Sequence, residues 1–334
     1  MKMEIACFGV RDYEIPYFKE LEEKYDYKLT LFPQFLNTEN YKDALGYEAV
    51  MVRGNCVVSY EAMEDLANHG LKYYLTRTAG FNHVDIEACK DFNIKTAYVP
   101  GYSPNAISEL ALTLAMMLLR NTAYMVNNTH NGNFKVTNQM FSREVRGCNV
   151  GILGCGRIGT TTASLFKGLG ATVYGYDIYQ SDKAKEVLTF LPLDEFIKKC
   201  DIILVHLAYI KGQNDNFINE EFINNMKDNS ILVNVARGEI LDLKAALNAV
   251  SNNHLAGLAI DVIDNEKSLF FKEFDPHHMD NEVHQKLIDL YPRVLVTPHV
   301  ASSTDKALID MIETSLKNMD EFLATNNCKN SLIK

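Results

Sequence analysis

Residues 149–159, NVGILGCGRIG, constrain the fold of this chain more than any other stretch. Their apolar start predicts a buried strand, Gly154, Gly156 and Gly159 follow with G-x-G-x-x-G spacing, and residues 160–168 predict a helix. In this context the first glycine allows a tight turn, the second lets the backbone approach a pyrophosphate, and the third lets helix and strand pack closely. The free amides at the start of such a helix favour phosphate groups. The stretch therefore predicts a dinucleotide site; a tight turn that binds nothing is the alternative.

A second predicted strand, residues 171–177, ends in Asp177, which lies 21 positions after Gly156. An acid about 20 residues on is the expected partner of the ribose hydroxyls, and it would repel a 2′-phosphate. The next three residues, Ile178, Tyr179 and Gln180, include no arginine that would bind such a phosphate. The sequence therefore predicts NAD rather than NADP.

Composition limits the class of protein. A length of 334 residues favours two domains, and a net charge of −10 disfavours nucleic-acid or anionic-membrane partners. We expect no signal peptide and no membrane span, because the longest apolar stretch, residues 111–119, is far too short to cross a bilayer. The seven cysteines contain no C-x-x-C pair, which indicates reduced thiols and a cytoplasmic protein. His277 and His278 are adjacent and do not face one ligand easily, so we expect no metal site.

Strands and helices alternate along most of the chain. Such alternation predicts an α/β protein with two doubly wound parallel-sheet, Rossmann-like domains. The predicted strands of the first hundred residues are 3–10, 27–32, 47–53, 73–78 and 94–99, and those after the glycine unit are 201–206, 230–236, 255–262 and 293–297. With the two strands at the glycine unit, the second set makes about six. Residues 265–284 read as a long loop, and residues 305–323 as the last helix.

The helix that begins at Ser103-Pro104 is apolar nearly all round. Serine suits the N-cap and proline the first helical position. A helix that is apolar on every side is buried, so it would lie between domains or between subunits. We expect a homodimer, although the apolar helix suits either position.

Polar side chains end several of the predicted strands. In open parallel sheets ligands bind at the carboxyl ends of strands, which makes these residues candidates for chemistry. Arg237, after an apolar strand, would clamp a carboxylate and polarise a carbonyl, or would pair with a structural acid. His299 follows a strand and a proline, and would exchange a proton or simply pack. Glu266 would orient the His299 imidazole.

These residues resemble the D-2-hydroxyacid dehydrogenase family over essentially the whole chain. The shared pieces are RTAGFNHVD, YSPNAISELAL, GILGCGRIG, the strand ending at Asp177, VNVARGEILD, the AIDV run that leads to Glu266, and TPH at His299. Several separate motifs occur in the family's order, which makes the match specific. Within the family the chain is similar to the D-lactate and 2-hydroxyacyl branch rather than to the formate branch.

The resemblance implies a role for each matching position. His299 would be the general acid in reduction and the general base in oxidation, Glu266 would pair with it, and Arg237 would bind the substrate carboxylate and polarise the 2-oxo group. The substrate would also meet Thr78, Ala79, Gly80 and Tyr102. The cofactor would meet Gly154, Gly156, Arg157, Ile158, Gly159, Asp177, Leu207, Ala208, Asn214, Val235, Ala236 and Asp261. Ala208 stands where a proline is frequent, and Val-Ala-Ser-Ser follows His299 in place of bulky aromatics, which leaves the pocket wall less defined.

The resemblance also implies an order of domains that differs from the order of the chain. Residues 1–101 and 300–334 would form a flavodoxin-like substrate domain, and residues 102–299 an inserted NAD-binding Rossmann domain. A cleft between them would close on a small 2-oxo or 2-hydroxy acid.

Arg53 is the informative residue for the substrate. Its surroundings, VRGNC, are similar to the (R)-2-hydroxyglutarate dehydrogenases, where this arginine binds the distal carboxylate. An apolar substrate would leave a desolvated arginine unpaired, at a cost of about 1–3 kcal/mol. The sequence therefore favours 2-oxoglutarate as substrate, unless Arg53 meets a protein acid such as Glu48 or Asp85. The alternatives are a D-2-hydroxyisocaproate or D-lactate dehydrogenase and, from another class, an NADH-sensing protein without turnover.

Overall fold

The computed structural model describes residues 2–270 and 272–333 and divides into two compact units. The terminal unit comprises Met1–Ser103 and Ser303–Lys334, and the central unit comprises Pro104–Ser302. Each unit contains its own parallel sheet. The predicted fold class, two doubly wound parallel-sheet domains, is confirmed.

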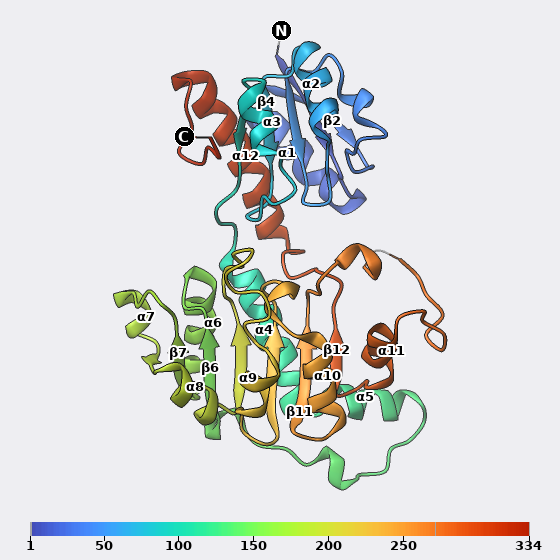
Figure 1. Cartoon of the computed structure of the whole chain (residues 1–334), viewed down its shortest axis with the longest axis vertical. Helices are drawn as coiled ribbons and strands as arrows, with labels where there is room; N and C mark the ends of the chain where they lie inside the picture. Colours follow the sequence, from blue (N-terminus) through green and yellow to red (C-terminus); the bar gives the residue numbers. More distant parts are fainter. Residues whose placement is uncertain (1, 271, 334) are drawn as a thin grey trace. The chain divides into compact units, whose positions relative to one another are not determined.

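The central unit is built on a seven-stranded parallel sheet in the order β12-β11-β10-β9-β6-β7-β8 (Figure 1). Its strands are β6 (Asn149–Leu153), β7 (Thr172–Tyr176), β8 (Thr189–Phe190), β9 (Ile202–Val205), β10 (Ser230–Asn234), β11 (Leu255–Ile260) and β12 (Val294–Val296). The sequence predicts about six strands, and the additional one is β8. Two residues are too few to show a hydrophobic period, which explains why the pattern missed it.

Helices cover both faces of this sheet. They are α4 (Pro104–Leu119), α5 (Thr122–His130), α6 (Arg157–Gly168), α7 (Asp182–Lys185), α8 (Leu193–Lys199), α9 (Glu220–Asn224), α10 (Leu243–Ser251) and α11 (Glu282–Asp289). Helices α4 and α6 pack together on one face, and α8, α9, α10 and α11 contribute to the apolar core on the other. The apolar helix α4 lies against β10 and β11, where Gly257 leaves room for Leu118.

Two local differences from the predicted elements have a clear cause. Helix α6 begins at Arg157, three residues before the predicted start, because Gly159 already lies inside the first turn of the helix. The stretch predicted as a loop from 265 to 284 contains a short 3-10 helix, Glu266–Ser268, and the start of α11 at Glu282. Asn281 caps α11 by accepting from the backbone N–H groups of Val283 and His284.

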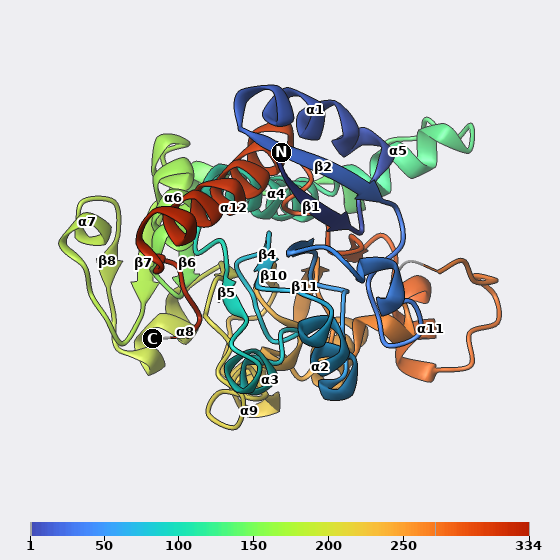
Figure 2. The ribbon, with the colours of Figure 1, turned by 90° about the horizontal axis from the view of Figure 1, so that it is seen from above.

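The terminal unit has a five-stranded parallel sheet in the order β2-β1-β3-β4-β5. Its elements are β1 (Met3–Phe8), α1 (Ile15–Lys24), β2 (Tyr27–Phe32), β3 (Ala49–Val52), α2 (Tyr60–Asn68), β4 (Tyr73–Thr76), α3 (Ile86–Asp91), β5 (Lys95–Ala97) and α12 (Asp305–Thr325). Figure 2 shows α1 and α12 side by side on one face of the sheet, with α2 and α3 on the other. Strands β3 and β4 are buried at every position, as expected for a sheet covered on both faces.

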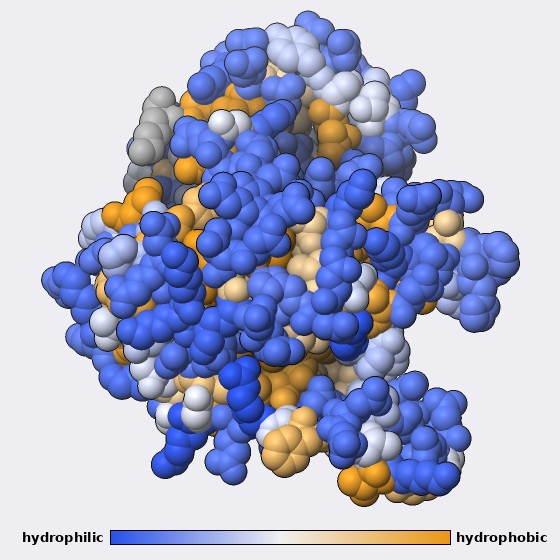
Figure 3. All heavy atoms as spheres, turned by 60° about the horizontal axis from the view of Figure 1, so that its bottom comes forward, coloured by the Kyte–Doolittle hydropathy of each residue, from blue (hydrophilic) through white to orange (hydrophobic). Residues whose placement is uncertain are grey.

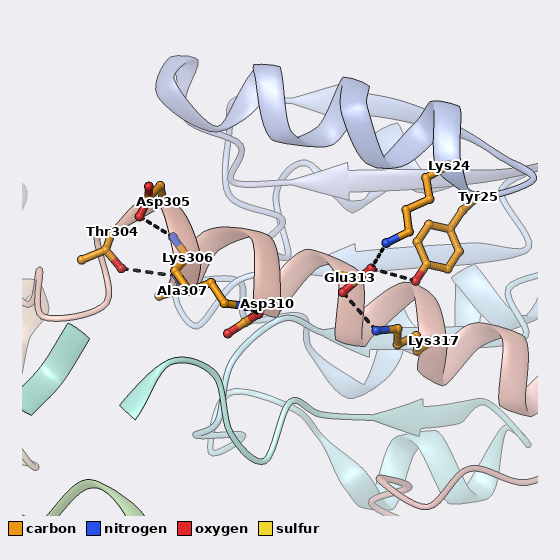
Figure 4. Close-up of polar contacts among 9 residues, drawn as sticks. All are labelled: Lys24, Tyr25, Thr304, Asp305, Lys306, Ala307, Asp310, Glu313 and Lys317. Atoms are coloured by element: carbon orange, nitrogen blue, oxygen red, sulfur yellow. Dashed lines mark hydrogen bonds and ion pairs between the residues drawn. The ribbon is translucent and has the colours of Figure 1, made fainter. Parts of the chain in front are cut away.

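Helix α12 returns from the far end of the sequence and is tied to α1 by a polar cluster (Figure 4). Glu313 accepts hydrogen bonds from Lys24, from Lys317 at 3.0 Å and from the Tyr25 hydroxyl at 3.2 Å. Hydrogen bonds from Lys24 and Lys317 lower the pKa of Glu313 to about 2. The helix begins after Thr304, whose side chain accepts from Ala307 N.

All seven cysteines are buried and none forms a disulfide. Desolvation raises the pKa of several of their thiols, for example those of Cys7, Cys89 and Cys200, to about 12. Among the residues that the structure describes, no helix combines the length and apolar character needed to cross a bilayer.

Candidate active site

The glycine turn lies at the carboxyl end of β6. Gly154 has φ +94°, and a Cβ there would lie 2.6 Å from the backbone of His206 and Leu207. A Cβ on Gly159 would lie 2.0 Å from the carbonyl oxygen of Gly154. A Cβ on Gly156 would meet nothing within 4 Å. Packing thus requires the first and third glycines, whereas the second borders open space that fits a pyrophosphate.

Asp177 lies beside this turn, directly after β7. Its Oδ2 accepts from Cys155 N at 2.6 Å, and its Oδ1 accepts from Tyr179 N at 2.9 Å. Helix α6 starts after Gly156, which has no side chain to cap the first N–H groups, so these remain available to an anion. The open glycine position, the uncapped helix start and the acid together fit a bound NAD.

The other predicted cofactor residues follow the neighbouring strands β9 and β10. Leu207 and Ala208 come after β9, and Asn214 closes their loop by donating to Ala208 O and accepting from Ile210 N, each at 2.8 Å. Val235 and Ala236 come directly after β10. Because β9 pairs with both β6 and β10, all these positions lie at the same edge of the sheet as the glycine turn.

His299 and Glu266 form a hydrogen-bonded pair in the central unit. His299 Nδ1 lies 2.8 Å from Glu266 Oε2, and the two side chains are 39% and 24% exposed. An ionised carboxylate can only accept, so Nδ1 carries the hydrogen of this bond. The opposite nitrogen, Nε2, is therefore the atom of His299 that can exchange a proton with a ligand.

The backbone that carries His299 is held in an uncommon conformation. His299 has φ +54°, and its N–H donates to Asp261 O at 2.9 Å. The Asp261 carboxylate accepts from Thr297 Oγ1 at 2.5 Å, from Val300 N at 2.9 Å and from Ala301 N at 3.0 Å. Burial raises the pKa of Asp261. Asp261, which the resemblance assigns to the cofactor, thus has its carboxylate engaged by the loop around His299.

Arg237 follows β10 and is half-buried. Its Nη1 donates to Ala236 O at 2.7 Å, and Asn234 Nδ2 donates to Arg237 O at 2.9 Å. A Cβ on Gly238 would lie 1.9 Å from the carbonyl carbon of Ile263, so this turn packs directly against the segment that leads to Glu266. Strands β10, β11 and β12 are neighbours, which brings Arg237 and the His299–Glu266 pair to one edge of the sheet.

Arg53, in the terminal unit, meets an acid that the sequence does not indicate. Its Nη1 lies 3.6 Å from Glu14 Oε2, and Glu14 is fully buried. Glu48 instead pairs with a lysine, and Asp85 caps α3. The sequence does not single out Glu14, because an acid just before a helix with an early proline is typical of a helix N-terminus. Its Oε2 does accept a hydrogen bond from the backbone N–H of Arg11.

Glu14 is shared between two arginines. Arg77 is 1% exposed and donates from Nη1 to Glu14 Oε1 at 2.7 Å. Arg53 Nη1 is buried and has no hydrogen-bond partner among the described residues. One carboxylate therefore faces two guanidinium groups, and positive charge is left at Arg53.

The loop Thr78, Ala79 and Gly80 follows β4 in the same unit. A Cβ on Gly54 would lie 3.8 Å from Thr78 Cγ2, so this loop is a neighbour of the turn that follows Arg53. The structure therefore brings two of the predicted substrate-binding segments together. Tyr102 lies in the segment between β5 and α4.

The chain is similar to known proteins in both sequence and structure. Residues 112–301 match the family model of the D-isomer specific 2-hydroxyacid dehydrogenase NAD-binding domain. An aromatic 2-oxoacid reductase of Clostridium sporogenes is 35% identical over 332 residues, which are 99% of each chain. A D-lactate dehydrogenase structure from Treponema pallidum gives a TM-score of 0.89 at 32% identity, covering 99% of this chain and 100% of that one. A D-2-hydroxyisocaproate dehydrogenase structure gives 0.91 at 29% identity with the same coverage.

Proposed function

The chain belongs to the D-isomer specific 2-hydroxyacid dehydrogenase family and is an NAD-dependent oxidoreductase, and we propose that its substrate is 2-oxoglutarate, reduced to (R)-2-hydroxyglutarate. The relatives are named for aromatic 2-oxo acids, lactate and hydroxyisocaproate, so family membership leaves the substrate side chain open. The observation that carries this proposal is the positive charge left at Arg53.

His299 is the proton donor in this proposal. NADH, when bound, supplies the hydride that reduces the 2-oxo carbon. His299 Nε2 gives its proton to the carbonyl oxygen, and in the reverse direction it takes the proton back. Glu266, bound at Nδ1, fixes the tautomer and stabilises the charged imidazole.

Arg237 binds the carboxylate next to the 2-oxo group. A guanidinium offers two parallel donors to a carboxylate and polarises a nearby carbonyl. Its Nη1 donates to a backbone carbonyl rather than to an acid, so the charge of the side chain is available to the substrate. The N–H groups of Thr78, Ala79 and Gly80 assist the binding of the same carboxylate.

Arg53 binds the distal carboxylate of the substrate. Two arginines share Glu14, and Arg77 makes the shorter contact, 2.7 Å against 3.6 Å. A second anion beside Arg53 completes the neutralisation of this cluster. An apolar side chain in its place leaves this cation unpaired, which costs about 1–3 kcal/mol.

The test compares three 2-oxo acids as substrates. We expect wild type to show a higher kcat/KM for 2-oxoglutarate than for 4-methyl-2-oxopentanoate or pyruvate. Arg53→Ala should lower kcat/KM for 2-oxoglutarate by about tenfold or more and leave pyruvate little changed, because about 1.4 kcal/mol is tenfold. Lys72→Ala, which removes an exposed cation of the same unit, is the control. A wild type that prefers the apolar acids would refute the substrate assignment.

An apolar or aromatic 2-oxo acid is the second candidate. The observation in its favour is the contact of Arg53 with Glu14, which neutralises part of the positive charge. The same assay, with an aromatic 2-oxo acid added as a fourth substrate, separates the two candidates. An NADH sensor without turnover is the remote alternative. The presence of Arg237 and of the His299–Glu266 pair at one edge of the sheet argues against it, and a wild type inactive with every 2-oxo acid would support it.

A homodimer is part of the proposal. Large apolar side chains are exposed on α5 and on the segment after it, including Val126, Phe134, Val136 and Phe141. Figure 3 shows one face of the molecule, where hydrophobic residues are scattered among mainly hydrophilic ones. Burial of this apolar group against a second copy would remove it from water. Light scattering of wild type and Phe141→Asp tests the dimer.

The reduced thiols favour the cytoplasm as the location of the protein.

A further inference from the structure

A chain of hydrogen bonds leads from His83 to the carbonyl of Gly80 in the terminal unit. His83 Nε2 lies 2.8 Å from Thr76 Oγ1, and Thr76 Oγ1 lies 2.7 Å from Thr78 Oγ1. Thr78 Oγ1 donates to Gly80 O at 2.6 Å. These residues span the end of β4 and the loop after it. The chemistry proposed above makes no use of His83.

The last of these bonds fixes the direction of the other two. A carbonyl oxygen can only accept, so the one hydrogen of the Thr78 hydroxyl is committed to Gly80. Thr78 Oγ1 must then accept from Thr76, which commits the Thr76 hydrogen as well. Thr76 Oγ1 must in turn accept from His83. The imidazole therefore carries a hydrogen on Nε2.

The residues of this hydrogen-bond chain are shielded from water. Thr76 is fully buried and His83 is half-buried. Desolvation lowers the pKa of His83 to about 4, so the ring is neutral at pH 7. A buried hydroxyl without a partner is destabilising, and the imidazole is the group that supplies the hydrogen required by Thr76.

The loop held by this hydrogen-bond chain comprises residues 78–80. In the proposed function this loop binds the carboxylate that all 2-oxo acids share. The backbone N–H groups of Thr78, Ala79 and Gly80 donate to no group within residues 2–270 and 272–333. Thr78 is also fixed on its carbonyl side, where Val99 N donates to it at 3.0 Å. Donors that are oriented before binding lose less freedom when a ligand arrives.

We propose that His83 is a positioning residue, which acts through the hydroxyls of Thr76 and Thr78 to set the Gly80 peptide and the carboxylate-binding amides around it. The inference rests on the proposed function, because it takes residues 78–80 as part of the substrate site. His83 would affect the binding of the carboxylate next to the reacting carbon, whereas Arg53 would affect the binding of the distal carboxylate. The two ends of the substrate can therefore be tested separately.

The first experiment compares His83→Phe with His83→Gln, using 2-oxoglutarate, pyruvate and NADH. We expect His83→Phe to raise KM for both acids by about tenfold, which corresponds to about 1.4 kcal/mol. KM for NADH and kcat should stay close to those of wild type. His83→Gln retains an N–H donor, so it should restore most of the affinity for both acids. Circular dichroism confirms that each variant is folded.

The second experiment tests whether the residues act as one chain. Thr78→Val should raise KM for both acids as His83→Phe does. The double variant should be no worse than the more affected single variant, because either change interrupts the same chain. His69→Gln, on the surface of the same unit, is the matched control.

Several results would overturn the inference. A folded His83→Phe with wild-type KM for both acids would do so, as would an equal rise in KM for NADH. A rise confined to 2-oxoglutarate would place the effect at the Arg53 end. If wild type reduces no 2-oxo acid, the proposed function fails instead. Titration calorimetry of 2-oxoglutarate with wild type and His83→Phe then still decides whether His83 supports binding.

Discussion

The two units carry charged groups at the carboxyl ends of similar parallel sheets, but they expose them very differently. In the central unit the His299 and Glu266 side chains are 39% and 24% exposed. In the terminal unit Arg77 and Glu14 are 1% and 0% exposed. A group that exchanges protons needs an accessible atom, whereas a group that holds an anion gains from a low dielectric. In the proposed function, proton transfer belongs to the central unit, and the buried ion pair of the terminal unit supports recognition of the distal carboxylate by Arg53.

The sharpest test of this contrast is His299→Ala. Loss of the proton donor should lower kcat by about 10²–10⁴-fold. NADH binding, followed by its fluorescence, should be unchanged, because the glycine turn is untouched. His278→Ala, at an exposed position of the central unit, is the control. A kcat near that of wild type would remove the proton-transfer role from the central unit.

Neutralising the acid in each pair should affect stability to very different extents. Glu14→Gln leaves the buried Arg77 and the partly buried Arg53 without their shared carboxylate, which should lower the free energy of unfolding by about 3–5 kcal/mol. Glu266→Gln affects a partly exposed pair, so its effect on stability should be at most about 1 kcal/mol while kcat falls. Chemical denaturation of the two variants measures this difference. Equal destabilisation by Glu14→Gln and Glu266→Gln would contradict the difference between the two units.

Each unit also contains a histidine whose pKa is lowered by desolvation. The pKa of His206 falls to about 3 and that of His83 to about 4. Both are neutral in the folded state but take up a proton in the unfolded state below about pH 6.5. The free energy of unfolding should therefore fall as pH drops from about 6.5 to 4, by up to about 1.4 kcal/mol per pH unit for each histidine.

His206→Asn should flatten this pH profile, and His83→Gln should flatten it independently. Thermal unfolding between pH 7 and 5 gives the slopes. Profiles parallel to that of wild type would show that these imidazoles titrate normally in the folded protein.

The smallest effect should come from the cluster on α12. Glu313→Gln should lower the free energy of unfolding at pH 7 by at most about 1 kcal/mol, since its lysine partners are exposed and screened by water. The pKa of Glu313 is lowered to about 2, so its contribution is present above about pH 4.5 and is lost as pH falls toward 2. Asp26→Asn, which removes a highly exposed ion pair, should have no measurable effect. A larger loss in Asp26→Asn would contradict this ranking.

The fold and the central unit were largely predictable because their signals are local. Apolar runs mark the strands, and the glycine turn, Asp177, Arg237 and His299 each follow a recognisable strand. The structure confirms the elements and pairs His299 with Glu266 at 2.8 Å. The two-residue strand β8 and the start of α6 were missed because neither has a hydrophobic period of its own.

The charged cluster of the terminal unit could not be predicted in the same way. Glu14, Arg53 and Arg77 come from three separate segments, and only the packing of β1, β3 and β4 side by side brings them together. Nothing near Glu14 in the sequence distinguishes it from an ordinary helix-terminal acid. The chain from His83 to Gly80 is local in sequence, yet its direction follows from atomic contacts rather than from residue types.

Because every thiol is buried, the native protein should give little background reaction with thiol-directed probes. The chain contains no tryptophan, and its seven cysteines lie inside the two cores. A maleimide dye should therefore attach almost solely to a cysteine introduced on the surface, without prior removal of the natural ones. One engineered tryptophan would likewise give a fluorescence signal without background, so each unit could be followed separately.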